Sequence, residues 1–248
     1  MTSSVSETSG PTELAATAPS PVRDGHWQAV TAMASPGFRE IVELFDADDR
    51  IGGTYFRIVE KGFQPVDLDP LSDKPLIGVG GIFAPDTSPE QVGKELDDRV
   101  AVLAKKRLTP SRSAERQIEA RAIRSALSSG LRLSGFPANL RFITGQWRID
   151  FGKTGRLLDV VAVDLETGAL VVIELKAKSD TTAKATVSAY AAYVREHADA
   201  FGPYFSAMAT AMAELYGCRD MPSSVDAARV TGLAAWPAGD SFKIIACP

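Results

Sequence analysis

The stretch that decides the fold runs from Arg156 to Lys178 and reads RLLDVVAVDLETGALVVIELKAK. Two runs rich in Val, Leu and Ile flank a short turn, LETG, which predicts a β-hairpin closed by a four-residue loop. Three charged residues, Asp159, Glu174 and Lys176, lie inside these apolar strands. Because burying an unpaired carboxylate is costly, an acid in each strand requires a compensating partner.

The register of this hairpin brings the charges together. Closing the strands at Asp164 and Ala169 sets Asp159 opposite Glu174, and directly opposed residues have Cβ atoms roughly 4.5–5.5 Å apart. Lys176 follows Glu174 by two positions, so alternation puts it on the same face. A slip of two residues would keep the acids on one face, whereas a slip of one would send them to opposite faces. The hypothesis therefore depends on this register.

Two opposed carboxylates repel each other unless positive charge lies between them. A hard divalent cation such as Mg²⁺ suits them, because it takes one or two carboxylates and keeps several waters. Lys176 could then orient or deprotonate an attacking water, or stabilise developing negative charge. The alternative is a salt-bridge cluster on a solvated sheet face, with Lys176 neutralising one acid. Apolar residues on both faces of the strands favour a hairpin covered on both sides.

A helix predicted from Ser113 to Gly130 contributes a further acid. Its sequence, SAERQIEARAIRSALSSG, has a serine cap and a terminal glycine. Glu119 falls in the middle of the apolar arc of this helix. Glu115 lies in the first turn, where the helix dipole favours an acid without any function. We therefore expect Glu119 to point inward as a site residue.

This order of residues resembles the PD-(D/E)xK nuclease superfamily and, more narrowly, the nuclease domain of mismatch-type DNA endonucleases and related uncharacterised bacterial nucleases. The resemblance implies that Asp159 and Glu174 hold Mg²⁺ or Mn²⁺, with assistance from the backbone carbonyl of Leu175. It also implies that Lys176 acts on the attacking water. Glu119 would support the metal site from its helix.

The resemblance covers about 113–194 and departs from the family in two places. Leu158 stands at the position of the superfamily's Pro before the Asp, which many members also lack. Ala189 stands where relatives often carry a Gln four residues before a Tyr, here Tyr193. The family implies an α/β fold. Its restriction-endonuclease-like core has a mixed central sheet flanked by helices on both faces, and we expect the site at one edge of the sheet.

Three regions follow from composition and turn signals. Residues 1–25 are rich in Ser, Thr, Pro and Ala and are typical of a disordered tail. Residues 26–109 are expected to form a small N-terminal α+β unit of unknown role, and residues 110–248 the nuclease-like domain. In the N-terminal unit, a helix breaks at Ser35-Pro36-Gly37 and another begins with a capping box at Ser88.

Strands are also expected at 53–60 and 77–83 in the N-terminal unit. In the second domain, Gly202-Pro203 is expected to separate two helices, the first ending near Ala200. A closing strand pair is expected at 230–236 and 241–247. Trp147 is expected to belong to the core rather than to stack on a base.

The distribution of charge favours a nucleic-acid partner. Residues 101–184 contain 15 Lys and Arg against 8 Asp and Glu, a net of +7, whereas the whole chain carries −4. A basic band around the site is the footprint expected for phosphate contacts, although at least half of these charges are assigned to ordinary solvated helix surface. The contributors include Lys105, Lys106, Arg107, Arg112, Arg116, Arg121, Arg124 and Arg141.

The remaining composition predicts a cytoplasmic protein. No apolar run approaches the length of a transmembrane helix, so no membrane partner is expected. The N-terminus lacks the basic start and apolar core of a signal peptide. Cys218 and Cys247 are expected to be buried thiols in a reducing compartment, with one disulfide left open.

Together these observations predict a Mg²⁺-dependent deoxyribonuclease that hydrolyses phosphodiester bonds of DNA, in repair or in defence. A homodimer would supply the two sites needed to cut both strands. One alternative is a catalytically inactive nucleic-acid-binding module with a nuclease-like fold. Another is a protein-interaction component in which the charged cluster forms structural salt bridges.

Overall fold

The structure is a computed structural model that describes residues 20–46, 54–59, 61–67, 82–104, 113–151, 154–239 and 241–247. Residues 1–19 of the tail predicted at 1–25 lie outside these residues, as does most of the strand predicted at 77–83. The predicted end of the tail is wrong, because Val22 is buried and a helix begins at Asp24. Lys105, Lys106, Arg107 and Arg112 of the predicted basic band also lie outside them.

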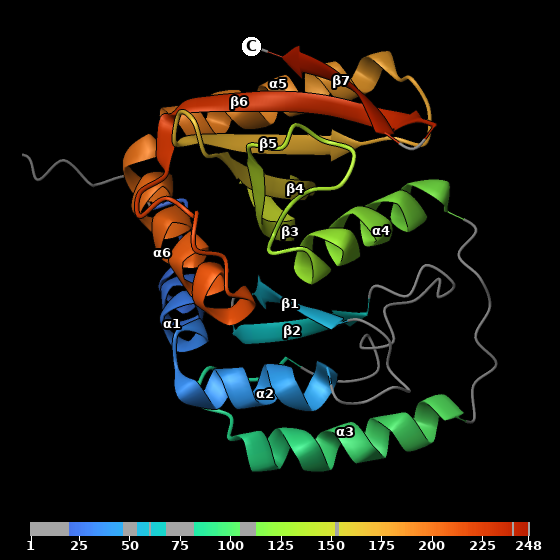
Figure 1. Cartoon of the computed structure of the whole chain (residues 1–248). Helices are drawn as coiled ribbons and strands as arrows, with labels where there is room; N and C mark the ends of the chain where they lie inside the picture. Colours follow the sequence, from blue (N-terminus) through green and yellow to red (C-terminus); the bar gives the residue numbers. More distant parts are fainter. Residues whose placement is uncertain are drawn as a thin grey trace, which may run out of the picture.

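A five-stranded mixed sheet forms the centre of the fold (Figure 1). The strand order is β3–β4–β5–β6–β7, in which β5 and β6 run parallel and the other neighbours run antiparallel. Every residue of β5 is buried, so this central strand is covered on both faces. The predicted α/β class is therefore confirmed. The strands are β3 (Leu140–Phe151), β4 (Thr154–Asp164), β5 (Ala169–Leu175), β6 (Asp226–Ala238) and β7 (Ser241–Cys247).

The hairpin of β4 and β5 has the predicted register. Val160 lies opposite Ile173 and Val163 lies opposite Leu170. The backbone N–H of Gly168 donates to the carbonyl of Asp164 at 2.8 Å and closes the loop. The paired part of the ladder ends at Val160 and Ile173. The hairpin therefore opens one residue before the level of the two acids.

Three helices, α4 (Ala114–Ser128), α5 (Thr181–Glu196) and α6 (Ala198–Tyr216), surround this sheet (Figure 1). Helix α5 lies against β5, β6 and β7, whereas α4 lies against β3, β4 and β5. Helix α6 contacts β3 and β6. The N-cap Ser113 of α4 accepts a hydrogen bond from the backbone N–H of Arg116, as the serine cap predicted.

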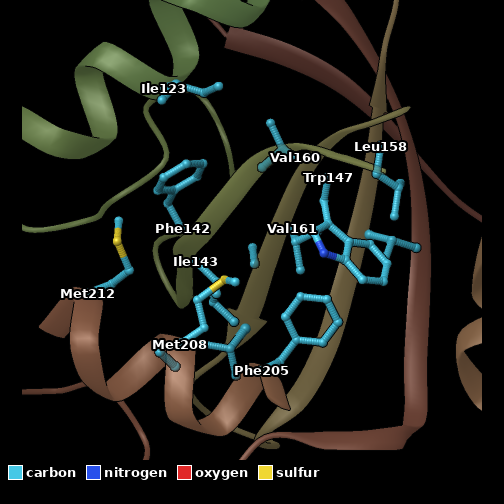
Figure 2. Packing of buried hydrophobic residues seen from close by; sticks show 14 of the residues in the cluster. Ile123, Phe142, Ile143, Trp147, Leu158, Val160, Val161, Phe205, Met208 and Met212 are labelled. Atoms are coloured by element: carbon cyan, nitrogen blue, oxygen red, sulfur yellow. The ribbon is translucent and has the colours of Figure 1, made fainter. Parts of the chain in front are cut away.

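The core between β3, β4 and α6 is built from aromatic and aliphatic side chains. Figure 2 shows Trp147 beside Phe205, with the two ring centroids 5.0 Å apart. Trp147 is 4% exposed, which confirms its assignment to the core. Met208 and Met212 lie on the same helix and are buried. Ile123 of α4 is part of the same hydrophobic cluster.

The predicted helix break at Gly202-Pro203 is wrong, because α6 continues through Pro203 and the break lies at His197. An interior Pro costs about 3 kcal/mol. Phe201, Tyr204 and Phe205, on either side of it, are fully buried. Burial of each such side chain contributes roughly 1.5–3 kcal/mol, which outweighs the cost of the proline.

The N-terminal unit packs against the sheet and α6 (Figure 1). Its strands form an antiparallel pair, and Phe63 makes an isolated bridge with Phe83. Ser88 and Gln91 form the predicted capping box through two hydrogen bonds of 3.2 Å. The domain boundary near 109 stays a prediction. The elements are α1 (Asp24–Met33), α2 (Pro36–Asp46), β1 (Thr54–Val59), β2 (Gly62–Asp67) and α3 (Pro89–Ala104).

Two further expectations concern the environment of the protein. Within the part of the chain that the structure describes, no helix is long and apolar enough to cross a membrane. Cys218 and Cys247 are buried free thiols, as the sequence predicted.

Candidate functional site

The site forms where β4 and β5 separate. The carboxylate of Asp159 accepts a hydrogen bond from the backbone N–H of Leu175 at 2.7 Å. Asp159 therefore replaces a backbone partner just past the last paired residues, Val160 and Ile173. The expectation of a site at one edge of the sheet is wrong in this respect, because β4 and β5 are interior strands and the site lies at their ends.

The backbone carbonyl of Leu175, at the end of β5, also points toward this opening. The N–H of Lys176 donates to Ala235 of β6 at 2.9 Å. Successive residues of a strand direct their backbone polar groups to opposite sides, and the N–H and C=O of one residue point to the same side. Because the N–H of Leu175 points toward β4, its carbonyl also points toward the opening beside Asp159.

Glu174 and Lys176 form an ion pair beside Asp159. Nζ of Lys176 lies 2.9 Å from Oε1 of Glu174, whose side chain is 9% exposed. The same Nζ lies 3.8 Å from Oε2 of Glu115, an exposed residue in the first turn of α4. Burial alone would lower the pKa of Lys176, but the hydrogen bond to Glu174 and the surrounding acids raise it above its ordinary value.

Glu119 reaches the site from α4, whose N-terminal half lies beside the end of β5 (Figure 1). Its Oε1 accepts a hydrogen bond of 2.5 Å from Nε2 of Gln146 in β3. Burial, together with the charges of Asp159 and Glu174, raises the pKa of Glu119 to about 8. The hydrogen bond from Gln146 and the charge of Arg116 act in the opposite direction.

The pKa of Asp159 is raised for similar reasons. Burial and the charge of Glu174 raise its pKa to about 7, although the hydrogen bond from Leu175 and the charge of Lys176 lower it. Glu119 thus interacts electrostatically with Asp159 and Glu174, and Asp159 interacts with Glu174 and Lys176. The structure therefore brings all of the predicted side chains, Glu119, Asp159, Glu174 and Lys176, to one place.

Gln146 is the site residue that the sequence did not reveal. Its φ is +50°, which is uncommon for a residue other than glycine and often marks functional sites. The register of β3 and β4 runs through Gly145 and Trp147, so Gln146 lies opposite Asp159. A polar residue between Gly145 and Trp147, which is expected in the core, was the only available signal.

The structure also tests what the sequence predicted for Arg141, Tyr193 and Ala189. Arg141 is 3% exposed and pairs with Asp220, so its assignment to a phosphate-binding band is wrong. Tyr193 packs against His197 and Phe201, with ring centroids 4.4 and 5.9 Å away. Ala189 is exposed. The amide that contacts an acid of the site therefore comes from β3 rather than from α5.

The chemistry of the donor set fits a hard divalent cation that keeps water ligands. No group of three His, Cys, Asp or Glu side chains that could hold a metal ion by itself occurs among the described residues. Mg²⁺ needs only one or two carboxylates, which Asp159 and Glu174 provide. The raised pKa of Asp159 also fits, because a cation would offset the repulsion from Glu174. Leu175 adds a carbonyl directed toward the same opening.

Comparison with known proteins adds no relative to this picture. No protein-family model, no curated protein and no solved structure matches the chain, so the resemblance drawn from the sequence pattern stays a prediction.

Proposed function

We propose that the chain is a metal-dependent nuclease that hydrolyses phosphodiester bonds of DNA. The observation that carries this proposal is the convergence of Glu119, Asp159, Glu174 and Lys176 where two central strands separate. Burial and mutual repulsion of the acids around this opening raise the pKa values of Glu119 and Asp159. Such an arrangement costs stability and is typical of a functional site.

In this proposal Asp159 and Glu174 hold Mg²⁺ or Mn²⁺, assisted by the carbonyl of Leu175. When bound, such an ion lowers the pKa of a coordinated water and offsets charge on the phosphate. Glu119 supports the acidic site from α4, and Gln146 fixes the orientation of its carboxyl group.

The raised pKa of Lys176 favours one of the two roles expected for it. A lysine that keeps its proton at neutral pH cannot readily take a proton from water. It can donate hydrogen bonds to an attacking water and stabilise negative charge that develops on the phosphate. We therefore assign Lys176 to orientation and charge stabilisation rather than to general base catalysis.

A cleavage assay tests the proposal. Purified protein is incubated with single-stranded, duplex and mismatched DNA in Mg²⁺, Mn²⁺ or EDTA. Glu174→Gln and Lys176→Met should each reduce cleavage at least about a hundredfold, the scale typical for a group acting directly in the reaction. Glu166→Gln and Lys178→Met change exposed residues of the same segment and should leave cleavage unchanged. Full Mg²⁺-dependent cutting by Glu174→Gln would contradict the assignment.

One observation favours a second function, a nucleic-acid-binding module without activity. Ala189 stands where related nucleases often carry Gln, and it is exposed on α5. In that case the wild-type protein shifts the mobility of DNA but produces no fragments in Mg²⁺ or Mn²⁺.

A further inference from the structure

The N-terminal unit and the five-stranded sheet enclose an open pocket of about 640 Å³ next to the candidate site. The start of α1, β1 and the turn after it form one wall, and residues of β3 and β4 form the other. Gln146 lines this pocket and also donates a hydrogen bond to Glu119. Leu157 lines it two residues before Asp159. The pocket therefore adjoins the acidic site through Gln146.

The lining of this pocket is positively charged. Its described lining residues include four Lys or Arg side chains and no Asp or Glu: Arg23, Arg57, Lys61 and Arg148. The whole chain carries a net charge of −4, so this local excess of cations departs from the average composition. Concentrated positive charge along a concave surface is the electrostatic footprint of a polyanion-binding site.

The pocket also contains exposed apolar surface. Ile82 and Leu157 are 45% and 43% exposed, and they are the two large apolar side chains exposed among the described residues. Both line this one pocket. Leu157 lies directly opposite Arg148 in the pairing of β3 and β4, so a cation and an apolar side chain adjoin there.

Cations beside apolar surface match the chemistry of unpaired nucleotides. Phosphates of any nucleic acid would contact the cations, but only a single strand exposes base faces to apolar side chains. In a duplex the bases stack on each other, so side chains of the size of Ile82 and Leu157 would contact the sugar-phosphate backbone alone. The apolar pair therefore distinguishes single-stranded from duplex ligands.

We propose that this pocket binds a single-stranded segment of DNA and directs its backbone past Gln146 toward Glu119 and Asp159. The cations contact phosphates, and Ile82 and Leu157 contact the bases. The inference extends the proposed function. Only the direction of the DNA toward Glu119 and Asp159 rests on that function. Binding in the pocket can nevertheless be measured without cleavage.

The test measures binding of a short labelled oligo(dT) by fluorescence anisotropy in EDTA. The triple variant Arg23→Gln/Lys61→Gln/Arg148→Gln should bind at least about tenfold more weakly. The slope of log affinity against log salt should shrink by about 2, since each phosphate contact to a single strand contributes about 0.7. The matched control, Lys94→Gln/Lys184→Gln/Arg219→Gln, removes three exposed cations that do not line the pocket and should retain wild-type affinity.

A second variant, Ile82→Ser/Leu157→Ser, should weaken binding of oligo(dT) without changing the salt slope or the affinity for duplex DNA. If the triple variant does not fold, Lys61→Gln alone, at an exposed turn position, should still reduce the slope. Equal affinities of the triple variant and the wild type, or equal losses in the control, would overturn the proposal. So would an apolar variant that binds oligo(dT) normally.

Failure of this inference is separable from failure of the proposed function. Glu174→Gln should bind oligo(dT) like the wild type, because Glu174 does not line the pocket. Normal binding by the pocket variants together with loss of cleavage in Glu174→Gln would refute the pocket and leave the nuclease intact. If the wild-type protein binds oligo(dT) through the pocket but never cuts DNA, the nuclease proposal is refuted and the pocket proposal stands.

Discussion

The carboxylate of Asp159 accepts a hydrogen bond from the backbone N–H of Leu175 at 2.7 Å, just past the end of the ladder between β4 and β5. This one side chain satisfies a donor at the open end of the hairpin and places its own charge beside Glu174. A backbone donor without an acceptor costs free energy when buried. Asp159 therefore has a structural role that can be separated from its charge.

Two substitutions of Asp159 should have different effects on stability. Asp159→Asn keeps a side-chain oxygen for the N–H of Leu175 and removes a charge with an unfavourable environment, so it should raise the Tm in EDTA at about pH 8. Asp159→Ala leaves the N–H unsatisfied and should be about 1–3 kcal/mol less stable than the Asn variant. Thermal unfolding measures both, and identical Tm values for the two variants would refute the separation. Both variants should lose cleavage.

The metal-free protein should become less stable as pH rises. The pKa values of Glu119 and Asp159 are raised in the folded state to about 8 and about 7. Between about pH 4 and pH 8 the folded state therefore binds more protons than the unfolded state, so the free energy of unfolding falls with increasing pH. We expect a fall of at least about 1.4 kcal/mol, the equivalent of one unit in pKa. Urea unfolding in EDTA at the two ends of this range measures it.

The control for this pH dependence is the double variant Glu119→Gln/Asp159→Asn, which removes both titrating groups. Its free energy of unfolding should vary less with pH than that of the wild type. A wild-type protein whose stability does not fall over the range would contradict the raised pKa values.

Addition of Mg²⁺ should stabilise the protein more at about pH 8 than at about pH 5. Carboxylates must lose their protons to hold a cation, so protons compete with Mg²⁺ at the lower pH. A ligand that binds only the folded state raises the Tm by mass action. Differential scanning fluorimetry with and without Mg²⁺ measures the shift. Glu174→Gln should respond less than the wild type, and an equal response would remove Glu174 from the ion site.

Removal of Lys176 should destabilise the metal-free protein. Lys176→Met leaves the buried carboxylate of Glu174 near Asp159 without its ammonium partner. Because Lys176 is partly exposed, the loss should be smaller than about 3 kcal/mol, the lower end of the range for a fully buried pair. Mg²⁺ should restore much of the lost stability, whereas a purely structural salt bridge would show no such recovery. Lys178→Met, an exposed position two residues further on, is the control.

Gln146 should act as a positioning residue for Glu119. Its hydrogen bond lowers the pKa of Glu119, so Gln146→Ala should raise that pKa further. The acid limb of the pH profile of cleavage should then move to higher pH. A role confined to stability would reduce the amount of folded protein without moving the profile. Gln146→Gly removes the same amide but relieves the positive φ, so an equal shift in both variants would confirm that the amide is responsible.

Local sequence patterns predicted the parts of the fold that depend on local chemistry. The register of the hairpin followed from the length of its loop, and the Ser113 cap and the apolar arc located α4 and the inward position of Glu119. The four charged residues could be assembled because a strand repeats every two residues and a helix every 3.6.

The errors arise where contacts between residues distant in the sequence determine the structure. The helix at Pro203 continues because Phe201 and Phe205 pack against Trp147, which is distant in sequence. Arg141 is buried because Asp220 pairs with it across 79 residues. Gln146 was missed because its contact with Glu119 depends on the positive φ at Gln146 in β3, which no residue pattern indicates.

The most direct test of the account is the position of a divalent ion in crystals of the wild-type protein grown with Mn²⁺. Anomalous scattering should place one ion within coordinating distance of the carboxylates of Asp159 and Glu174, and the peak should be absent from Glu174→Gln crystals. The same crystals should show Lys176 still beside the site. An ion found elsewhere, or none bound at these two carboxylates, would contradict the claim that this opening holds a metal.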